Sequence, residues 1–415
     1  MPRPSATLAR TPADERTSPH ASDASACPSC GGGRLSVVHE IARVPANSCI
    51  LLDSEAEALA CPAGSISLAL CADCGFIHNT RFDPARTEYS GRYEETQGFS
   101  GTFNRFHRDL AHRLIARHGL HGKRVLEIGC GKGEFLMLLA ELGGNFGLGI
   151  DPGVKPERLE GPARERLAFI ADFYSEDYAH EDVDFVVCKM TLEHIPDVDA
   201  FVATLRRGLG RRTATKVFFQ IPEALRILRT TAFEDIYHEH CSYFTPGSLG
   251  RLFRRAGFDP LAIDVEYGGQ YLTIEARPRG RGARPAPPLP IEDDLDETRT
   301  LAATFAKRTM ARIADWRQTV AAAHGEGRRI ALWGSGSKAV AFLNAVDPER
   351  RIGFVTDINP HRHGHFMPSS GQRILPPKEL AAVRPGLVIA MNAIYEQEIA
   401  RDLRQMGLEP ELRSL

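Results

Sequence analysis

The stretch Val125-Leu126-Glu127-Ile128-Gly129-Cys130-Gly131-Lys132-Gly133 sets the fold class of this 415-residue chain. An apolar run typical of a buried strand meets three alternating glycines, and residues 135–142 then continue with helical spacing. Glycine lets the backbone pass close to a ligand at a point where a Cβ atom would block the approach. The stretch therefore predicts an α/β, Rossmann-like domain that holds a nucleotide at this turn.

Acidic residues around the turn favour S-adenosylmethionine (SAM) as that nucleotide. The alternative is a glycine-rich turn of another Rossmann-like domain, but a dinucleotide site needs Gly or Ala at position 134, where this chain has Glu134. Glu127 suits a donor that carries an ammonium group. Asp151 ends the next predicted strand, where a carboxylate can accept both ribose hydroxyls, and Asp172 ends the one after, near the expected adenine amine. The predicted SAM-binding residues are Glu127, Gly129, Gly131, Gly133, Asp151 and Asp172.

Short apolar runs alternate with helical stretches along most of the chain. This alternation is typical of parallel sheets that are covered by helices. A linker rich in Pro, Gly and Arg over residues 277–290 separates two such α/β units. Strands are predicted over residues 124–128, 145–151, 167–171, 185–189, 217–221, 329–333, 352–355 and 387–391, and helices around residues 103–114, 295–324 and 339–346.

Two C-x-x-C-G motifs near the N-terminus predict a zinc ribbon. In such a motif the chain turns back so that both thiolates point at one ion, and Gly permits the tight turn. Four thiolates fill the tetrahedron and leave no open position, so the expected Zn²⁺ is structural. The alternatives are unrelated surface cysteines or a redox pair, and Cys49 and Cys61, between the motifs, are expected to be packing residues. The predicted ligands are Cys27, Cys30, Cys71 and Cys74.

Charge and composition exclude several partner classes. Lys and Arg total 51 against 53 for Asp and Glu, which leaves no basic footprint for nucleic acid or for an anionic membrane. We find no apolar run long enough to span a bilayer. Nine cysteines without framework spacing fit a reduced cytoplasm. Residues 1–24 are expected to form a disordered leader rather than a signal peptide, and a monomer is compatible with the sequence, which does not fix the oligomeric state.

Titratable side chains are concentrated in Tyr237-His238-Glu239-His240-Cys241-Ser242-Tyr243-Phe244. Methyl transfer to carbon needs a carbanion, and histidine, with an ordinary pKa of ~6.5, is the natural base that removes the proton. If the segment is extended, His238 and His240 share one face, so the pattern leaves the choice between them open. His194 is expected either to line the substrate pocket or to cap a loop. Together with the SAM turn, the segment predicts carbon methylation next to a carbonyl, against the alternative of a polar surface loop.

These motifs resemble the SAM-dependent C-methyltransferases of deoxysugar biosynthesis, which act on nucleotide-linked keto-sugars. The resemblance covers residues 27–415 and rests on the order of the domains and motifs. Two features depart from the family: the Gly129-Cys130-Gly131-Lys132-Gly133 loop, and the segment Met190-Thr191-Leu192-Glu193-His194-Ile195-Pro196, which follows the commoner pattern of small-molecule methyltransferases. The matching motifs are the two cysteine motifs, residues 127–133, 237–244 and 334–338, and Met391-Asn392-Ala393-Ile394-Tyr395-Glu396-Gln397-Glu398.

The resemblance implies an N-terminal zinc-binding module, a class I SAM methyltransferase domain and a C-terminal Rossmann-like α/β domain without its own cofactor. The outer two would hold a nucleotide-linked sugar of the dTDP type over the central domain. It further implies that His240 is the base and that Tyr237 and Glu239 orient it or contact the sugar. The expected boundaries are residues 25–90 for the zinc module, 91–276 for the SAM domain, 277–325 for the linker and helix, and 326–415 for the C-terminal domain.

Three other functions compete with this prediction. Gly334-Ser335-Gly336-Ser337-Lys338-Ala339 follows a predicted strand and Asp357 lies at a ribose position, as in a nicotinamide-dependent oxidoreductase. No catalytic group accompanies that turn, so a nucleotide-sugar or phosphate contact is preferred. A zinc ribbon on a methyltransferase fold also fits an RNA-modifying adaptor, although the chain lacks a basic stripe. Methyl transfer to an oxygen of a small hydroxylated acceptor would leave the fold and the SAM turn unchanged.

Overall fold

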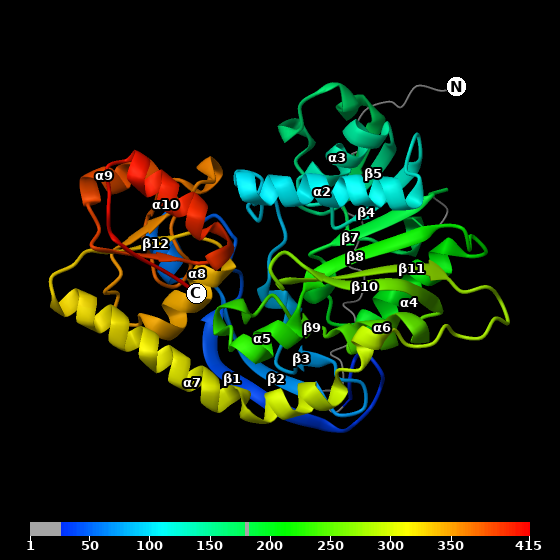
Figure 1. Ribbon diagram of the computed structural model, residues 1–415, viewed down its shortest axis with the longest axis horizontal. Helices are drawn as coiled ribbons and strands as arrows, with labels where there is room; N and C mark the ends of the chain where they lie inside the picture. The colour runs from blue at the N-terminus through cyan, green and yellow to red at the C-terminus, as the bar shows by residue number, and fades with distance from the viewer. Residues whose placement is uncertain (1–25, 179–181) are drawn as a thin grey trace.

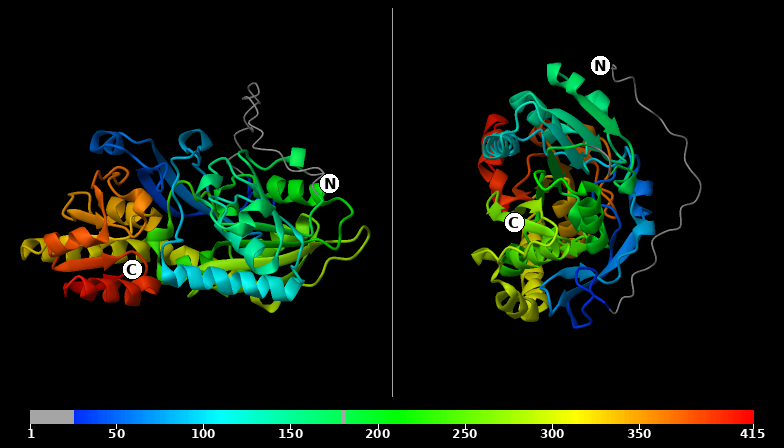
Figure 2. Two further views of the ribbon diagram at one scale, coloured as in Figure 1. Left: turned by 90° about the horizontal axis from the view of Figure 1, so that it is seen from above. Right: turned by 90° about the vertical axis from the view of Figure 1, so that its right-hand side faces the viewer.

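The computed structural model describes residues 26–178 and 182–415. The leader expected over residues 1–24 lies outside these residues. Within the described chain, three β-sheets build an N-terminal module, a central α/β domain and a C-terminal α/β domain. Figure 1 shows the central sheet at the right, the C-terminal sheet at the left and the N-terminal strands below their junction. Seen from above in Figure 2, the blue N-terminal strands again lie at this junction.

The N-terminal sheet is antiparallel and includes a strand from the middle of the sequence. Its strands, in order across the sheet, are β1 (Leu35–Pro45), β2 (Ala63–Cys71), β3 (Ile77–Asn79) and β9 (Ser242–Tyr243). The short helix α1 (Glu55–Leu59) lies between β1 and β2. Because β9 belongs to the titratable segment 237–244, its pairing with β3 attaches that segment to the N-terminal module.

The central domain alternates strands with helices, as its apolar runs predict. Strands predicted over residues 124–128 and 185–189 have the same bounds in the structure. The elements are α2 (Gly101–His118), β4 (Arg124–Ile128), α3 (Glu134–Gly143), β5 (Phe146–Ile150), β6 (Leu167–Ile170), β7 (Phe185–Lys189), α4 (Val198–Leu209), β8 (Lys216–Pro222), α5 (Ala224–Thr230), α6 (Pro246–Arg255), β10 (Phe258–Glu266) and β11 (Tyr271–Pro278).

The central sheet has the order β10-β11-β8-β7-β4-β5-β6, and its middle strands β8, β7 and β4 are buried on both faces. Strands β4 to β8 run parallel, as expected of apolar runs joined by helices. Side chains alternate between the faces, so Phe185 and Val187 pack with α2 and α3, whereas Val186 and Cys188 pack with α4 and α6. All carboxyl ends of the parallel strands therefore meet at one edge, next to the glycine turn after β4.

The hairpin β10–β11 is antiparallel to β8 and was not predicted from the sequence. Its edge strand β10 contains Pro260 beside a register shift and exposes part of its length, which weakens the apolar alternation. Because β11 ends at Pro278, the linker begins after this residue rather than at position 277.

The C-terminal domain has a parallel sheet of order β14-β13-β12-β15-β16. The long helix α7 runs from beneath the central domain to the C-terminal sheet (Figure 1) and packs against α5, β1 and α8. Among the described residues, no helix combines the length and apolar character that crossing a bilayer requires. The elements are α7 (Leu295–Gly325), β12 (Ile330–Trp333), α8 (Ser337–Val346), β13 (Phe354–Thr356), β14 (Ile374–Leu375), α9 (Leu380–Val383), β15 (Leu387–Ala390), α10 (Glu396–Gln405) and β16 (Glu411–Ser414).

Candidate active site

The glycine turn after β4 has a backbone that side chains would obstruct. Gly129, Gly131 and Gly133 have φ values of 67°, 53° and 81°, in the left-handed region. A Cβ atom on Gly129 would lie 2.0 Å from Oγ1 of Thr191, and one on Gly131 would lie 2.6 Å from Oε1 of Glu95. The backbone conformation therefore favours glycine at all three positions, and the Thr191 side chain leaves no room for a Cβ atom at Gly129.

The carboxylates predicted to bind SAM lie around this turn. Asp151 follows β5 and accepts hydrogen bonds from the backbone N–H groups of Gly131 (3.0 Å) and Gly153 (2.7 Å). Asp172 follows β6, is exposed, and accepts a hydrogen bond of 2.6 Å from the Tyr178 hydroxyl. Both carboxylates are therefore at the edge of the sheet where the turn lies.

Glu127 is buried beneath the turn with one carboxylate oxygen, Oε2, that has no hydrogen-bond partner among the described residues. Burial raises the pKa of Glu127, and the nearby Lys189 opposes this shift. A buried acceptor without a donor is costly, so this oxygen suits a ligand that brings an N–H group. The ammonium group of SAM is such a donor, and the residues present therefore fit SAM.

The segment before α2 covers the turn. The Nζ of Lys132 donates to the carbonyl oxygens of Tyr93 (2.8 Å) and Gly153 (3.3 Å), and it forms an ion pair with Glu95 at 3.2 Å. Sequence reasoning assigned no role to Lys132 or Glu95. No local pattern marks Lys132, because its partners lie 21 to 39 residues away.

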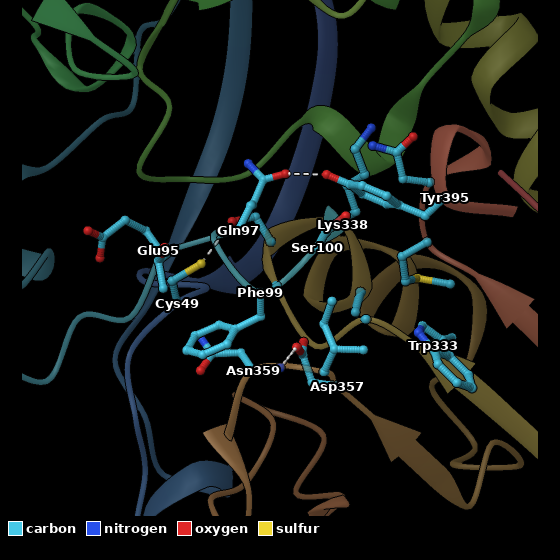
Figure 3. A pocket seen from close by; sticks show the side chains of 18 of the residues that line it. Cys49, Glu95, Gln97, Phe99, Ser100, Trp333, Lys338, Asp357, Asn359 and Tyr395 are labelled. Atoms are coloured by element: carbon cyan, nitrogen blue, oxygen red, sulfur yellow. Dashed lines mark hydrogen bonds between the residues drawn. The ribbon is translucent and has the colours of Figure 1, made fainter. Parts of the chain in front are cut away.

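A cavity of about 250 Å³ lies between the central and C-terminal domains (Figure 3). One buried water needs only about 10–15 Å³, so the cavity has room for a much larger ligand. Glu95 and Tyr237 line it from the central domain, Cys49 from the N-terminal module, and Ser337 and Asp357 from the C-terminal domain. Glu95 also lies against Gly131, so the cavity wall at this side chain adjoins the glycine turn. Cys49, expected to be a packing residue, is thus part of the cavity wall, whereas Cys61 packs with Leu52 and Ala58.

The C-terminal wall of the cavity repeats the arrangement seen at Asp151. Asp357 follows β13 and accepts hydrogen bonds from the backbone N–H groups of Ser335 (2.7 Å) and Asn359 (2.8 Å). The turn between β12 and α8 is therefore held by an acid from the next strand, as in the central domain. The side-chain amide of Asn359 donates to Glu94 at 3.0 Å, which joins the two domains at the cavity.

Residues 237–240 form a turn rather than an extended strand, so the condition under which His238 and His240 would share one face is not met. The backbone N–H of His240 donates to the carbonyl oxygen of Tyr237 at 3.2 Å and closes the turn. His238 is fully buried against Phe82, with ring centroids 5.2 Å apart, and against Gly64 of the N-terminal module. His240 instead contacts the Tyr237 ring at 4.1 Å. The turn thus separates the two histidines and leaves His240 next to the cavity wall.

His194 lies on the other side of His240, with ring centroids 4.6 Å apart. Its Nδ1 is 3.0 Å from the carbonyl oxygen of Glu239 and 2.9 Å from the Tyr89 hydroxyl. A carbonyl oxygen only accepts, so Nδ1 carries the proton and Nε2 keeps its lone pair. Burial lowers the pKa of His194 to about 4 and that of His240 well below its ordinary value, with His194 adding to the second shift. Both rings are therefore neutral near pH 7.

Glu239 is held by the N-terminal module. Its carboxylate accepts hydrogen bonds from the side-chain amide of Asn47 (3.0 Å), the backbone N–H of Ser48 (3.1 Å) and the Ser48 hydroxyl. Burial raises the pKa of Glu239, and the bonds from Ser48 and Asn47 oppose this shift. These donors fix the turn that carries Tyr237 and His240, and no sequence pattern linked them to it.

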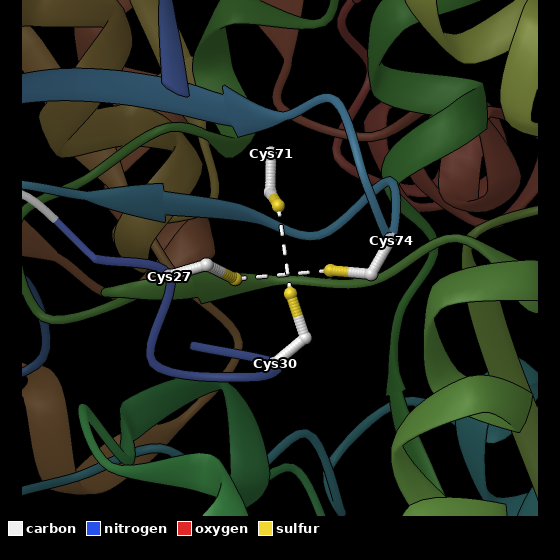
Figure 4. A group of neighbouring side chains, drawn as sticks. All are labelled: Cys27, Cys30, Cys71 and Cys74. Carbon is white, nitrogen blue, oxygen red and sulfur yellow. Dashed lines mark hydrogen bonds between the residues drawn. The ribbon is translucent and has the colours of Figure 1, made fainter. Parts of the chain in front are cut away.

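The four cysteines of the two C-x-x-C-G motifs converge on one point (Figure 4). The Sγ atoms of Cys27 and Cys74 are 3.7 Å apart, and those of Cys30 and Cys71 are 3.6 Å apart. A tetrahedral site with Zn–S bonds of about 2.3 Å has sulfur atoms about 3.8 Å apart. The spacing therefore fits Zn²⁺.

Comparisons with known proteins agree with this geometry. Residues 99–263 match a family model described as a methyltransferase domain, and residues 291–409 match one described as a C-methyltransferase C-terminal domain. The C-methyltransferase NovU of Streptomyces niveus is 27% identical over 333 residues, which are 74% of this chain and 76% of that protein. The chain belongs to the SAM-dependent C-methyltransferase family.

Other relatives match a shorter part of this chain. The ubiquinone biosynthesis O-methyltransferase of Cupriavidus pinatubonensis is 32% identical over 158 residues, 34% of this chain and 62% of that protein. The crystal structure of a S-adenosylmethionine-dependent methyltransferase from Listeria monocytogenes has a TM-score of 0.34 at 14% identity, over 42% of this chain and 99% of that chain.

In this methyltransferase the structure brings together most of the residues expected to act. Tyr237 and the C-terminal turn line one cavity, and Glu95 of the same wall lies against the SAM turn. His240 is one ring contact away from this cavity. Sequence reasoning missed Glu193, which lies in the same cluster as His194 and His240. No sequence pattern marked it, and only the fold shows that Glu193 and His194 both approach His240.

Proposed function

We propose that this enzyme methylates the carbon next to the keto group of a nucleotide-linked, dTDP-type deoxysugar, with His240 as the base. The observation that carries the proposal is the position of His240. It contacts Tyr237, which lines a cavity whose wall includes Glu95, a neighbour of the SAM turn, and the second nucleotide-type turn. A base beside a site for two ligands is the arrangement that proton removal before methyl transfer requires.

In the proposed reaction the imidazole of His240 accepts the proton from the carbon next to the keto group. The C–H bond breaks, and its electron pair moves toward the carbonyl oxygen as the enolate forms. Burial raises the pKa of Tyr237 well above its ordinary value, so its hydroxyl stays protonated and can donate to that oxygen. SAM, when bound at Gly129–Gly133, Glu127, Asp151 and Asp172, supplies the methyl group.

The C-terminal turn supports a nucleotide as the handle of the substrate. Gly336 and Ser337 line the cavity at the first residues of α8, and a helix N-terminus of this length favours phosphate groups. Asp357 has the same position after its strand as Asp151 has in the SAM domain. Lys338 contributes a cation at the cavity wall and is held by Asp235 at 2.8 Å. These features fit a nucleoside diphosphate better than a small hydroxylated acceptor.

The metal and the domain division belong to the same proposal. Cys27, Cys30, Cys71 and Cys74 would hold a structural Zn²⁺ in an N-terminal module, which places Asn47 and Ser48 on Glu239. The central domain over residues 91–276 would bind SAM, and residues 326–415 would bind the nucleotide. Glu239 then orients the turn that carries the base.

The experiment is product analysis with SAM and a panel of dTDP-linked 4-keto sugars. Mass spectrometry and NMR of the product should show a new C–CH₃ group on the carbon next to the ketone. A product with an O–CH₃ group would show that the proposed acceptor atom is wrong. Turnover of a small phenol or alcohol, but of none of the nucleotide-linked sugars, would show that the proposed substrate is wrong.

A further inference from the structure

Glu193 is a buried carboxyl group that the proposed reaction does not yet use. It lies in the short 3₁₀ turn Leu192–His194 after β7 and is 1% exposed. Both of its carboxylate oxygens lack a hydrogen-bond partner among the described residues. A buried polar group without a hydrogen-bond partner destabilises the folded protein, so the presence of Glu193 at this position needs an explanation other than stability.

The neighbours of Glu193 point to that explanation. One carboxylate oxygen of Glu193, one ring nitrogen of His194 and one of His240 all lie within 4.8 Å of one another. Glu193 also interacts with Tyr89, Cys188, Cys241 and Tyr271, and each of these groups is neutral when protonated. Glu193 is therefore the acid that faces the two imidazoles.

His240, the proposed base, needs a nearby carboxylate. Removal of the substrate proton turns His240 into an imidazolium inside the protein, and burial strongly disfavours that charge. A carboxylate within about 5 Å converts the isolated cation into an ion pair. Protonation of His240 then leaves the pair neutral instead of leaving a single buried charge.

We propose that Glu193 is the positioning residue for the base, whose carboxylate stabilises the imidazolium form of His240 as the substrate proton arrives. The inference rests on the proposed function of His240. In the active form of the enzyme Glu193 is ionised and stays so while the proton moves from the substrate carbon to a nitrogen of His240. No oxidant or other reactant is needed.

The pair should give the enzyme a characteristic pH dependence. Burial raises the pKa of Glu193 to about 8. Since the carboxylate is the active form, the rate of proton removal should rise as the pH increases toward 8 and should fall as the pH drops below it. Replacement of Glu193 by Gln removes the titrating group and should make the rate low and independent of pH over this range.

The kinetic test compares the full-length wild type with Glu193→Gln and Glu193→Asp, using SAM and a dTDP-linked 4-keto sugar. We expect Glu193→Gln to lower kcat about 10- to 100-fold without changing the KM for SAM, as is typical when a residue that supports a catalytic group is removed. Glu193→Asp should recover part of the rate and the pH dependence. Asp197→Asn, which alters an N-cap in the same loop, is the matched control and should behave as wild type.

A second measurement needs no substrate and separates this inference from the proposed function. In protein with ¹⁵N-labelled histidine, the His240 ring signals, identified by their loss in His240→Asn, should shift with a midpoint near pH 8 in the wild type. They should show no such shift in Glu193→Gln. An identical titration in both proteins would overturn the role of Glu193, whatever the substrate. Retention of a second metal ion that Glu193→Gln loses would also overturn it, because the three residues would then be metal ligands.

Discussion

Replacing Glu193 by Gln should stabilise the protein, and more so at high pH. The pKa of this carboxyl is about 8 in the folded state and about 4.3 in an unfolded chain. Folding therefore requires Glu193 to keep a proton that it would otherwise release, at a cost of about 1.4 kcal/mol for each pKa unit. The cost is absent below the unfolded pKa and grows as the pH rises to about 8, where it reaches a few kcal/mol.

Calorimetric Tm values of wild type and Glu193→Gln at pH 5 and pH 8.5 measure this effect. We expect nearly similar Tm values at pH 5 and a variant that melts about 10–20 °C higher at pH 8.5. The shift of almost four pKa units amounts to about 5 kcal/mol, and 1 kcal/mol corresponds to about 2–4 °C for a domain of this size. Asp197→Asn again serves as the control. If Glu193→Gln is equally or less stable than wild type at pH 8.5, the carboxyl has a stabilising partner, and the reasoning about an unpartnered buried acid fails.

Two further predictions concern the bound groups. The double variant Cys27→Ser/Cys30→Ser should lose one tightly held Zn²⁺ per chain and unfold at lower temperature, because metal binding and folding are linked; full metal content by mass spectrometry would contradict the site. Asp151→Ala should weaken SAM binding in calorimetry by about 1.5–3 kcal/mol while the fold is kept, and unchanged affinity would move the ribose contact to another residue.

Local sequence patterns predicted the elements that hold the SAM turn. The strands Arg124–Ile128 and Phe185–Lys189 are buried along most of their length, so apolar residues predominate in each. Gly129 and Gly131 were recognisable because they occupy left-handed backbone that favours this residue. Where a strand is short, as in β13, the predicted start at residue 352 lay two residues too early.

Contacts between distant segments could not be predicted in this way. Ser48 and Glu239 are 191 residues apart, and their hydrogen bond exists only because β9 pairs with the N-terminal sheet. The choice between His238 and His240 depended on the turn that the chain makes at this point. Glu193 has an ordinary position in the sequence, and its burial next to two histidines follows from the packing of β7 and the 237–240 turn.

Exchange of the substrate proton tests the central claim most directly. A dTDP-linked 4-keto sugar is incubated in D₂O without SAM, with wild type or His240→Asn, and deuterium at the carbon next to the ketone is followed by NMR. Asparagine keeps the size of the side chain but cannot accept a proton near neutral pH. The account predicts exchange by the wild type and a loss of about 10²–10⁴-fold in His240→Asn, with SAM affinity near that of the wild type. Exchange by His240→Asn at the rate of the wild type would contradict the role of His240. Methylation by the wild type without any exchange would contradict it as well.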